Sequence, residues 1–338
     1  MKLNEGIHLV RLPDGSAELC AGLETMFHFP QCSEKEFQLL QRLVVGCTRP
    51  DLSDFAKACH IPLTRVSEIL RTLADAELLQ LRNPRLYGGP DDGFWSRVGG
   101  AKMRRTYRLR QKLSVSLNRA DRMAQLLAVE LGAAGIGKIQ VPTSTRSPEP
   151  DLETAPNPQL STKDLVEQRR RHAAVTTQRI AADLAVQFSW GIPDPVAAQK
   201  AMQTNQPFLA VVAGHDFVEV GPLVVPGLTP CTSCLALHQA TAVTHLAERA
   251  ANLHWAAFPR VETALAGVGA AIAAAQALAF LDCRALHPGD VTRISVDGAV
   301  TTRHFESHPE CDCSYLPMEL DVPPEPAFAQ RARTVPAA

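Results

Sequence analysis

The sequence lacks an excess of charge of either sign. Its 338 residues include 34 Lys and Arg against 35 Asp and Glu, and the formal net charge is −1. A chain without a net basic field does not attract nucleic acid as a whole, although local basic patches remain open. We therefore expect no nucleic-acid partner.

The sequence also lacks an export signal. Its first residues, MKLNEGIHLV, contain no long apolar run ahead of a small-residue cleavage site. The nine cysteines are an odd number spread through a long chain, which favours a reducing compartment. We expect a cytoplasmic protein whose thiols bind metal or pack in the core instead of forming disulfides.

One uncharged segment, 264–281, is long enough to cross a bilayer. It consists mostly of Ala and Gly, which contribute little to membrane insertion, and it contains Gln276. Small side chains suit a helix that packs closely on a sheet or on a partner subunit. We expect a buried helix here and no membrane contact.

Four of the nine cysteines form two close pairs. CTSC places Cys231 and Cys234 two residues apart, and CDC places Cys311 and Cys313 one residue apart, with a proline near each pair to form the turns that such pairs need. Thiolate pairs from distant parts of a chain complete a tetrahedral four-sulfur shell, which zinc prefers. Because this shell has no open position, the spacing predicts a structural zinc ion.

Other interpretations of the cysteines stay open. The four could be unrelated buried residues, or the first pair could be a redox dithiol, which is disfavoured because no strand followed by a helix is evident around it. A nearby histidine could replace a sulfur, but we expect ordinary polar residues at His238, His304 and His308. We expect small, mostly buried residues at the scattered cysteines Cys20, Cys32, Cys47, Cys59 and Cys283.

Residues 1–82 have the pattern of a first domain in which strands precede three helices. IHLVRLPDGSAELCAG predicts a hairpin, and TMFHF predicts a third strand. The first helix has a capping box of Ser33 and Glu36, and the second has Asp51 or Ser53 as its cap. Core positions of the third helix are Val66, Ile69, Leu70 and Leu73. This order predicts a winged-helix-like module.

Residues 83–112 are rich in Gly, Pro and charge and predict a linker. Its basic residues are Arg97, Lys102, Arg104, Arg105, Arg108, Arg110 and Lys112. We expect a solvated, flexible connection, with a contact to a partner protein as the alternative.

A second domain, residues 113–318, begins with the strand–helix–strand pattern of an α/β fold, and residues 319–338 are expected to be a disordered tail. KLSVSL and GKIQVP are the strands around the helix ADRMAQLLAVELGAAG. The remaining expected elements are a loop over 142–163, a helix around 163–186, a strand in PFLAVVAG, a strand pair in FVEVGPLVVPG, two helices within 238–282 and a hairpin from VTRISVD and AVTTRHFES.

The segment GPLVVPGLTPCTSCLALHQ, together with HPECDC and LGAAGIGKIQV, resembles the ThiF-like, ubiquitin-activating-like family. More closely, it is similar to the ocin-ThiF-like partner proteins of the cyclodehydratases that make thiazole- and oxazole-modified peptides. The N-terminal module resembles the recognition element for ribosomal precursor peptides that is often fused in front. The resemblance implies a Rossmann-type domain with zinc knuckles, behind a winged-helix-like peptide-recognition domain, and a homodimer.

The sequence departs from the family at the nucleotide site. Active members have a Gly-rich loop after the first strand, where only Gly allows the backbone to approach the phosphates. The corresponding turn here has no glycine and contains Asn118, Arg119 and Asp121. The glycines at 132, 135 and 137 fall at a helix end, where capping is the simpler explanation. We therefore expect the adenylation machinery to be lost and name no catalytic residue.

The resemblance implies that the first domain binds the leader of a precursor peptide and presents it to a YcaO-type cyclodehydratase. An exposed strand edge beside a helix accepts an extended peptide. The predicted contact residues are Thr25, Met26, Phe27 and His28 on the strand, and Arg65, Glu68, Ile69 and Thr72 on the third helix.

Two other functions stay open. One is an active ATP-dependent adenylating enzyme, against which the missing Gly-rich loop argues. The other is a winged-helix transcription regulator. In its third helix, the mixture of Arg65 and Arg71 with Glu68, Asp75 and Glu77 suits phosphate contacts poorly.

Overall fold

The structure is a computed structural model. It describes residues 1–80, 94, 106–142, 163–164, 166, 173–240, 243, 245–253, 259–284 and 287–314. The chain divides into two compact units, Met1–Arg108 and Leu109–Ala338. The boundaries that the sequence suggested, 1–82 for the first domain and 113–318 for the second, stay predictions.

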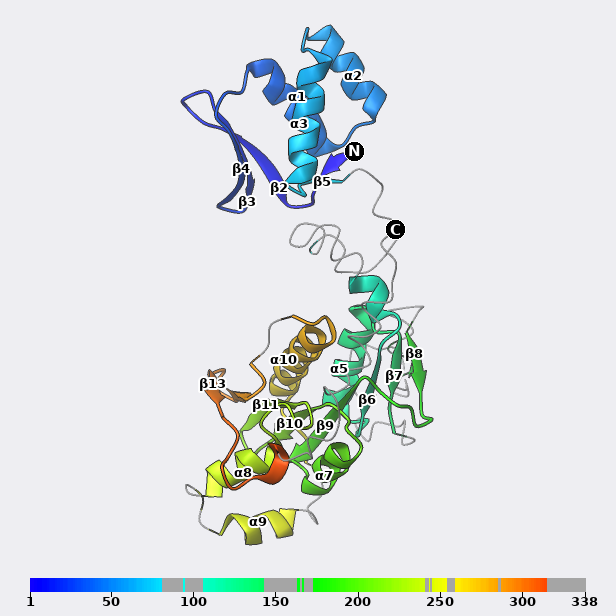
Figure 1. Ribbon diagram of the computed structural model, residues 1–338, viewed down its shortest axis with the longest axis vertical. Helices are drawn as coiled ribbons and strands as arrows, with labels where there is room; N and C mark the ends of the chain where they lie inside the picture. The colour runs from blue at the N-terminus through cyan, green and yellow to red at the C-terminus, as the bar shows by residue number, and fades with distance from the viewer. Residues whose placement is uncertain are drawn as a thin grey trace. The chain divides into compact units, whose positions relative to one another are not determined.

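The first unit contains short strands followed by three helices (Figure 1). Strands β2, β3 and β4 form an antiparallel sheet in that order, and β1 pairs with β5. The strands are β1 (Lys2–Leu3), β2 (Ile7–Arg11), β3 (Ala17–Ala21), β4 (Glu24–Phe29) and β5 (Leu79–Gln80), and the helices are α1 (Glu34–Val45), α2 (Arg49–Ala58) and α3 (Leu63–Asp75). The predicted hairpin and third strand are confirmed, and the winged-helix classification stays a prediction.

Local capping fixes where the first two helices begin. Ser33 and Glu36 form the predicted capping box at the start of α1. The predicted cap of α2 is wrong, because Thr48 is the N-cap and Asp51 is its reciprocal partner three residues later. Both arrangements satisfy backbone N–H groups that the first helical turn leaves unpaired.

A leucine-rich core joins these elements. Val66, Ile69 and Leu73 of α3 are buried together with Leu39, Leu40 and Leu43 of α1. Leu70, the fourth predicted core position, is half-buried and packs against the same cluster. The helical spacing of the apolar residues therefore identified the buried side of α3.

The second unit is built on an eight-stranded mixed sheet with the order β13-β12-β11-β10-β9-β6-β7-β8. The strands from β10 to β8 run parallel to their neighbours, and β11, β12 and β13 continue the sheet antiparallel. The strands are β6 (Ser114–Leu117), β7 (Lys138–Gln140), β8 (Ala174–Thr176), β9 (Leu184–Trp190), β10 (Phe208–Ala213), β11 (Phe217–Val224), β12 (Asp290–Ser295) and β13 (Val300–His304).

Helices cover both faces of this sheet (Figure 1). Leu209 of β10 belongs to a core shared with α5 and α10, whereas the adjacent Phe208 packs with residues of α7 and with the cysteine cluster. Adjacent strand residues point to opposite faces, so these two cores lie on opposite sides of the sheet. The helices are α5 (Arg122–Ala133), α7 (Pro195–Gln203), α8 (Thr232–Ala240), α9 (Leu246–Leu253) and α10 (Thr263–Leu281).

Helix α10 is long and apolar enough to span a membrane, and half of its most apolar window is buried inside the fold. It packs against α5 and β11. A Cβ atom at Gly269 would lie 2.8 Å from Val218 Cγ1, so glycine is what allows the helix to lie this close to the sheet. The predicted packing of 264–281 on a sheet is confirmed.

Two other expectations within the second domain are wrong. The helix around 163–186 is interrupted by β8 and by the start of β9. The strand pair at 217–227 is one strand, β11, in which Gly221 and Pro222 form a bulge opposite β10. The two helices expected within 238–282 are α9 and α10, and the sequence did not predict α8, which begins earlier, at Thr232. The expected loop over 143–162 and the tail from 319 lie outside the described residues.

The predicted linker ends in a buried ion pair. Arg110 is 1% exposed, and its Nε and Nη2 donate to the two carboxylate oxygens of Asp282 at 2.8 and 2.5 Å. Its Nη1 donates to the Ala134 carbonyl oxygen at 2.8 Å. Residues 106–110 are helical. The expectation of a solvated linker is therefore wrong at Arg110, because a buried carboxylate 172 residues later in the chain binds it.

Candidate metal centre and open strand edge

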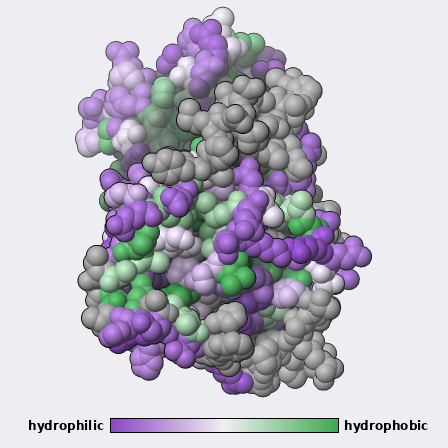
Figure 2. All heavy atoms as spheres, turned by 60° about the horizontal axis from the view of Figure 1, so that its bottom comes forward, coloured by the Kyte–Doolittle hydropathy of each residue, from purple (hydrophilic) through white to green (hydrophobic). Residues whose placement is uncertain are grey.

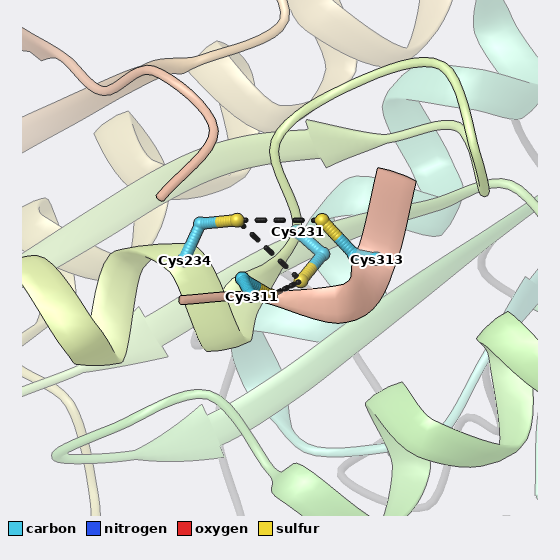
Figure 3. A group of neighbouring side chains, drawn as sticks. All are labelled: Cys231, Cys234, Cys311 and Cys313. Atoms are coloured by element: carbon cyan, nitrogen blue, oxygen red, sulfur yellow. Dashed lines mark hydrogen bonds between the residues drawn. The ribbon is translucent and has the colours of Figure 1, made fainter. Parts of the chain in front are cut away.

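The four predicted cysteine ligands come together in the second unit (Figure 3). Cys231 precedes α8 and Cys234 lies in its first turn, while Cys311 and Cys313 come from the last described segment of the chain. Their Sγ atoms all lie within 4.8 Å of one another. Cys231 and Cys234 are buried, and the other two are half-buried. The cluster can hold a metal ion.

The sulfur separations agree with a tetrahedral thiolate shell. They are 3.4 Å for Cys234 and Cys313, 3.6 Å for Cys231 and Cys311, and 3.9 Å for Cys231 and Cys234. A tetrahedron with metal–sulfur bonds of about 2.3 Å has edges of about 3.8 Å. A disulfide requires about 2.05 Å, so all four are free thiols.

The thiols of the cluster titrate unequally. Burial opposes ionisation of Cys234, but hydrogen bonds from the backbone N–H groups of His308 and Cys231 outweigh it, so the pKa of Cys234 is lowered. Burial raises the pKa of Cys311, and it raises the pKa of Cys313 to about 11. A bound cation would hold all four as thiolates, because a metal competes with the proton for each sulfur.

One argument against a redox dithiol is wrong. Strand β11 ends at Val224, and α8 begins at Thr232, so a strand and then a helix do surround the first cysteine pair. The arrangement of the second pair decides the question instead. Cys311 and Cys313 lie as close to the first pair as its own two sulfurs lie to each other, which fits a four-sulfur site and not an isolated dithiol.

The nearby histidines interact with other groups. His238 Nε2 lies 3.1 Å from the Glu306 carbonyl oxygen, and its ring packs edge-on against His308. His304 Nδ1 lies 2.7 Å from Asp290 Oδ1. These three are not among the grouped ligands. Of the scattered cysteines, Cys20 and Cys32 are buried as expected, but Cys283 is exposed.

Strand β4, with four of the predicted contact residues, is an edge of the first unit's sheet and pairs only with β3 among the described residues. The Leu12 N–H donates to the Ser16 carbonyl oxygen, which fixes the even-numbered residues of β3 as those that face β2. The odd-numbered residues therefore face β4 and bind the backbones of Phe27 and Phe29. Across a register shift at Met26, the backbone groups of Thr25 and His28 point to the open side.

The side chains of β4 lie on two faces. Glu18 of β3 accepts a hydrogen bond from Thr25 Oγ1 at 3.0 Å and lies 3.2 Å from His28 Nδ1. Phe27 is half-buried with its ring centroid 4.8 Å from that of Phe29, and Met26 is exposed. Thr25 and His28 thus combine outward backbone groups with side chains on one polar face.

The four predicted residues on α3 differ in exposure. Glu68 is exposed, Thr72 is half-buried and donates to the Glu68 carbonyl oxygen, and Ile69 is a core residue at 3% exposure. Arg65 Nε donates to Glu36 Oε1 at 2.7 Å, so this guanidinium ties α3 to α1. The sequence alone does not identify Glu36 as its partner, because the two residues lie 29 positions apart on different helices.

The Glu36–Arg65 pair predicts a pH-dependent stability. Burial opposes ionisation of Glu36, but hydrogen bonds from Arg65 and Ser33 outweigh it and hold the pKa of Glu36 below its usual 4.5. A lowered folded pKa adds stability above the unfolded pKa, and this is lost as the pH falls through the folded value. Glu36→Gln keeps the capping box. It should cost about 0.5–1 kcal/mol at neutral pH, since Arg65 is partly exposed, and nothing in acid. Urea unfolding of the wild type and of Glu36→Gln, at neutral pH and at a pH below the folded pKa of Glu36, measures this difference.

Side chains fill the turn after β6. Asn118 accepts a hydrogen bond from the Phe188 N–H at 2.8 Å and donates to the Phe188 carbonyl oxygen at 3.0 Å. Asp121 caps α5 by accepting from the Ala124 N–H, and it also pairs with Arg119. The N-terminus of α5, where a phosphate would bind, therefore already carries a carboxylate.

The glycines near the second strand have packing roles. Gly135 has φ +103° just after α5 ends, which agrees with a helix-end glycine. A Cβ atom would lie 2.8 Å from Val166 Cγ1 at Gly132 and 1.8 Å from the Gln111 carbonyl oxygen at Gly137. Capping thus explains one of the three, and close approach explains the other two.

The second unit is a Rossmann-like α/β fold, with parallel strands, helices on both faces and an antiparallel extension. No family model matches the chain, and no curated protein matches it. Among solved structures it is similar to the microcin C7 biosynthetic enzyme MccB in complex with N-formylated MccA, with 16% identity, a TM-score of 0.61, and coverage of 93% of this chain and 99% of MccB.

Two further structures share the fold. Escherichia coli MccB with ATP is 15% identical, with a TM-score of 0.60 and the same coverage. A heterocyclase in complex with substrate and cofactor is 15% identical, with a TM-score of 0.63, and the match covers 92% of this chain and 39% of the heterocyclase. At 15–16% sequence identity, the similarity to these structures shows the fold of the chain and nothing further.

Proposed function

We propose that the protein is a non-catalytic, leader-peptide-binding partner of a YcaO-type cyclodehydratase in the biosynthesis of azole-containing or thiopeptide-type ribosomal peptides. The neighbours support this class of pathway, because MccB is a biosynthetic enzyme seen with the peptide MccA and the heterocyclase is seen with its substrate. The ThiF-like sequence resemblance supports the partner role.

The open edge of β4 is the observation that carries the proposal. Outward backbone groups at Thr25 and His28 supply hydrogen bonds to an extended peptide, and the half-buried Phe27 supplies an apolar contact on the inner face. Arg65, Glu68, Ile69 and Thr72 of α3 are proposed to provide specificity. Because Ile69 is buried and Arg65 is paired with Glu36, Glu68 and Thr72 are the more accessible of the four.

The argument for a non-catalytic role concerns the carboxyl ends of the parallel strands, where α/β folds bind nucleotides. In this chain, side chains and a helix occupy that edge of the sheet. Asp121 occupies the N-terminus of α5, and Asn118 binds β9 instead of leaving a glycine turn open. At the end of β9, a Cβ atom on Gly191 would lie 2.8 Å from Leu253 Cδ1, so α9 packs directly on this edge. These contacts leave ATP chemistry to the cyclodehydratase.

In this account the four-cysteine cluster holds a structural zinc ion. Four sulfurs fill a tetrahedral shell, so no position remains for a substrate or an activated water. The ion would join the start of α8 to the segment 311–313 and thereby close the second unit. We further propose a cytoplasmic homodimer without nucleic-acid or membrane contacts.

An adenylating enzyme is the second candidate, favoured by the likeness to MccB bound to ATP over 93% of this chain. An assay of pyrophosphate exchange with Mg-ATP and the precursor peptide distinguishes the adenylating enzyme from the non-catalytic partner. We expect no exchange above a protein-free control. Exchange that depends on the peptide would establish the enzyme.

A proline at position 28 tests peptide binding. The His28 N–H points away from β3, so His28→Pro keeps the ladder of the sheet and removes one donor from the open edge. We expect binding of the leader peptide encoded beside the protein to weaken by about tenfold or more, as fluorescence polarisation would measure.

The matched control is a proline on an edge strand of the other unit, Thr302→Pro, which should bind the leader as the wild type does. Both variants should keep the wild-type circular dichroism. Each loses one side-chain contact, His28 to Glu18 or Thr302 to Thr292, so the two melting temperatures should fall only slightly and by similar amounts. Equal binding by folded His28→Pro and wild type, or no binding by the wild type, would rule out this site.

A further inference from the structure

The outer face of the three-stranded sheet in the first unit gathers side chains of the kinds that bind metals. Leu19 of β3 is buried in the leucine-rich core, so its neighbours Glu18 and Cys20 point to the opposite face of the sheet. We propose that this outer face binds one exchangeable zinc ion through Glu18, Cys20 and His28, with His8 as the fourth ligand. Such a site does not depend on peptide binding by the first unit.

Strand register places these four residues side by side. His8 of β2 lies opposite Cys20, and His28 of β4 lies opposite Glu18. The Cβ atoms of directly opposite residues are about 4.5–5.5 Å apart, and residues two apart along one strand share a face. Glu18 and Cys20 therefore form the middle of the group, with one imidazole on the side of β2 and the other on the side of β4.

Three of these side chains already meet at the Glu18 carboxylate. Glu18 Oε1 lies 3.2 Å from His28 Nδ1, and Glu18 Oε2 lies 3.8 Å from Cys20 Sγ. A tetrahedral site with bonds of about 2.0–2.3 Å has ligand separations of about 3.3–3.8 Å. Thr25 Oγ1 donates to the same carboxylate at 3.0 Å. This hydroxyl would orient the carboxylate while the ion replaces the protons that now lie between the ligands.

Core packing does not explain Cys20. The residue is 7% exposed, but it does not belong to the described leucine-rich cluster on the other face of the sheet. Its neighbours across the strands are His8 and Thr25. A thiol shielded from solvent among imidazole, carboxylate and hydroxyl groups has the surroundings of a metal ligand. Thiolate, imidazole and carboxylate are the three ligand types that zinc takes in proteins.

This site should bind zinc more weakly than the four-cysteine cluster. The four sulfurs of that cluster already lie within 4.8 Å of one another, whereas the two histidines must turn toward Cys20 to close the shell. The side chain of His28 is 45% exposed and His8 is exposed, so both rings can turn. We therefore expect dialysis to remove this ion and added zinc to restore it.

Hydropathy does not identify a binding surface of this kind. On the face drawn in Figure 2, hydrophobic patches are separate and scattered among hydrophilic residues. The outer face of the β2–β3–β4 sheet is distinguished by its ligand chemistry instead. An ion bound there would tie β4 to β3 and β2 through side chains alone and leave the outward backbone groups of β4 open. Added zinc should therefore stabilise the first unit against unfolding.

Calorimetric titration of zinc into the dialysed, tag-free full chain tests the proposal. We expect the wild type to bind one zinc ion beyond the ion of the four-cysteine cluster. Cys20→Ser and His28→Gln should weaken this second site by at least about tenfold, and His8→Gln should weaken it less. His215→Gln and Cys283→Ser, which change an exposed histidine and an exposed cysteine of the second unit, should leave it unchanged.

Cobalt(II) identifies the ligands. Added to the chain whose four-cysteine cluster holds zinc, it should produce the near-ultraviolet absorption of a thiolate–cobalt bond, and Cys20→Ser should remove that absorption. Three results would overturn the proposal. These are a wild type that binds no further ion, a further ion that Cys20→Ser and His28→Gln bind as tightly as the wild type does, or bound cobalt without thiolate absorption.

The His28→Gln variant keeps the test decisive where Cys20→Ser does not fold. It changes an exposed side chain and keeps the backbone N–H at the open edge of β4. Unchanged zinc affinity in folded His28→Gln would by itself exclude this ligand set. Leader binding by the wild type, measured without added zinc, reports on the peptide site separately.

Discussion

Serine in place of Cys234 is expected to abolish metal binding at the proposed zinc site and to destabilise the second unit. Cys234 is fully buried, and its sulfur lies within 4 Å of those of Cys231 and Cys313. Three remaining thiols leave one position of a tetrahedral shell to a neutral hydroxyl, a much weaker ligand for zinc. Metal content by mass spectrometry should fall from one ion per chain to nearly none.

The loss of stability follows from linkage between metal binding and folding. A ligand present at 1,000 times its dissociation constant stabilises the folded state by about 4 kcal/mol. Cys234→Ser should lose a contribution of that order, and a chelator should lower the wild-type melting temperature without affecting the variant. Exposed Cys283→Ser is the control and should keep both metal and stability. A wild type that binds no metal, or a variant that keeps it, would contradict the site.

Alanine in place of Asp282 is expected to destabilise the second unit by about 3–5 kcal/mol. Asp282 receives two hydrogen bonds from Arg110, and both side chains are almost fully buried. Removing the carboxylate leaves the Arg110 guanidinium buried without its counter-charge at the position of Asp282, while its bond to the neutral Ala134 carbonyl oxygen remains. Chemical denaturation followed through the second unit's transition measures the loss.

A double variant separates the lost charge pair from lost packing. Replacing both partners by apolar residues, Arg110→Met with Asp282→Leu, removes both buried charges and should recover most of the stability, because Arg284, which also pairs with Asp282, is exposed to solvent. If Asp282→Ala costs less than about 1 kcal/mol, the range of an exposed pair, then water reaches this pair and the buried ion pair is not the structural link between residue 110 and the end of α10.

Local signals in the sequence predicted much of the fold. Ser33 and Glu36 predict the start of α1, because a capping box involves only two residues three positions apart. The apolar spacing of α3 predicted its buried side for the same reason. The strand–helix–strand opening of the second unit also depends on short-range pattern, and the structure confirms it.

The errors have non-local causes. Arg110 has the composition of an exposed linker, and only Asp282, far along the chain, makes it a core residue. Gly221 and Pro222 have the character of a turn, but neighbouring strands hold them as a bulge within β11. At the site, cysteine spacing predicted the sulfur cluster, whereas the pairing of Arg65 and the outward positions of β4 depend on tertiary contacts and sheet register.

Hydrogen exchange with and without the leader peptide tests the central claim most directly. The account predicts that the peptide alone slows exchange at the amides of Thr25 and His28, with no change around Asn118 and no further change on adding Mg-ATP. Protection at the turn 118–121 that requires Mg-ATP, with β4 unaffected, would contradict it.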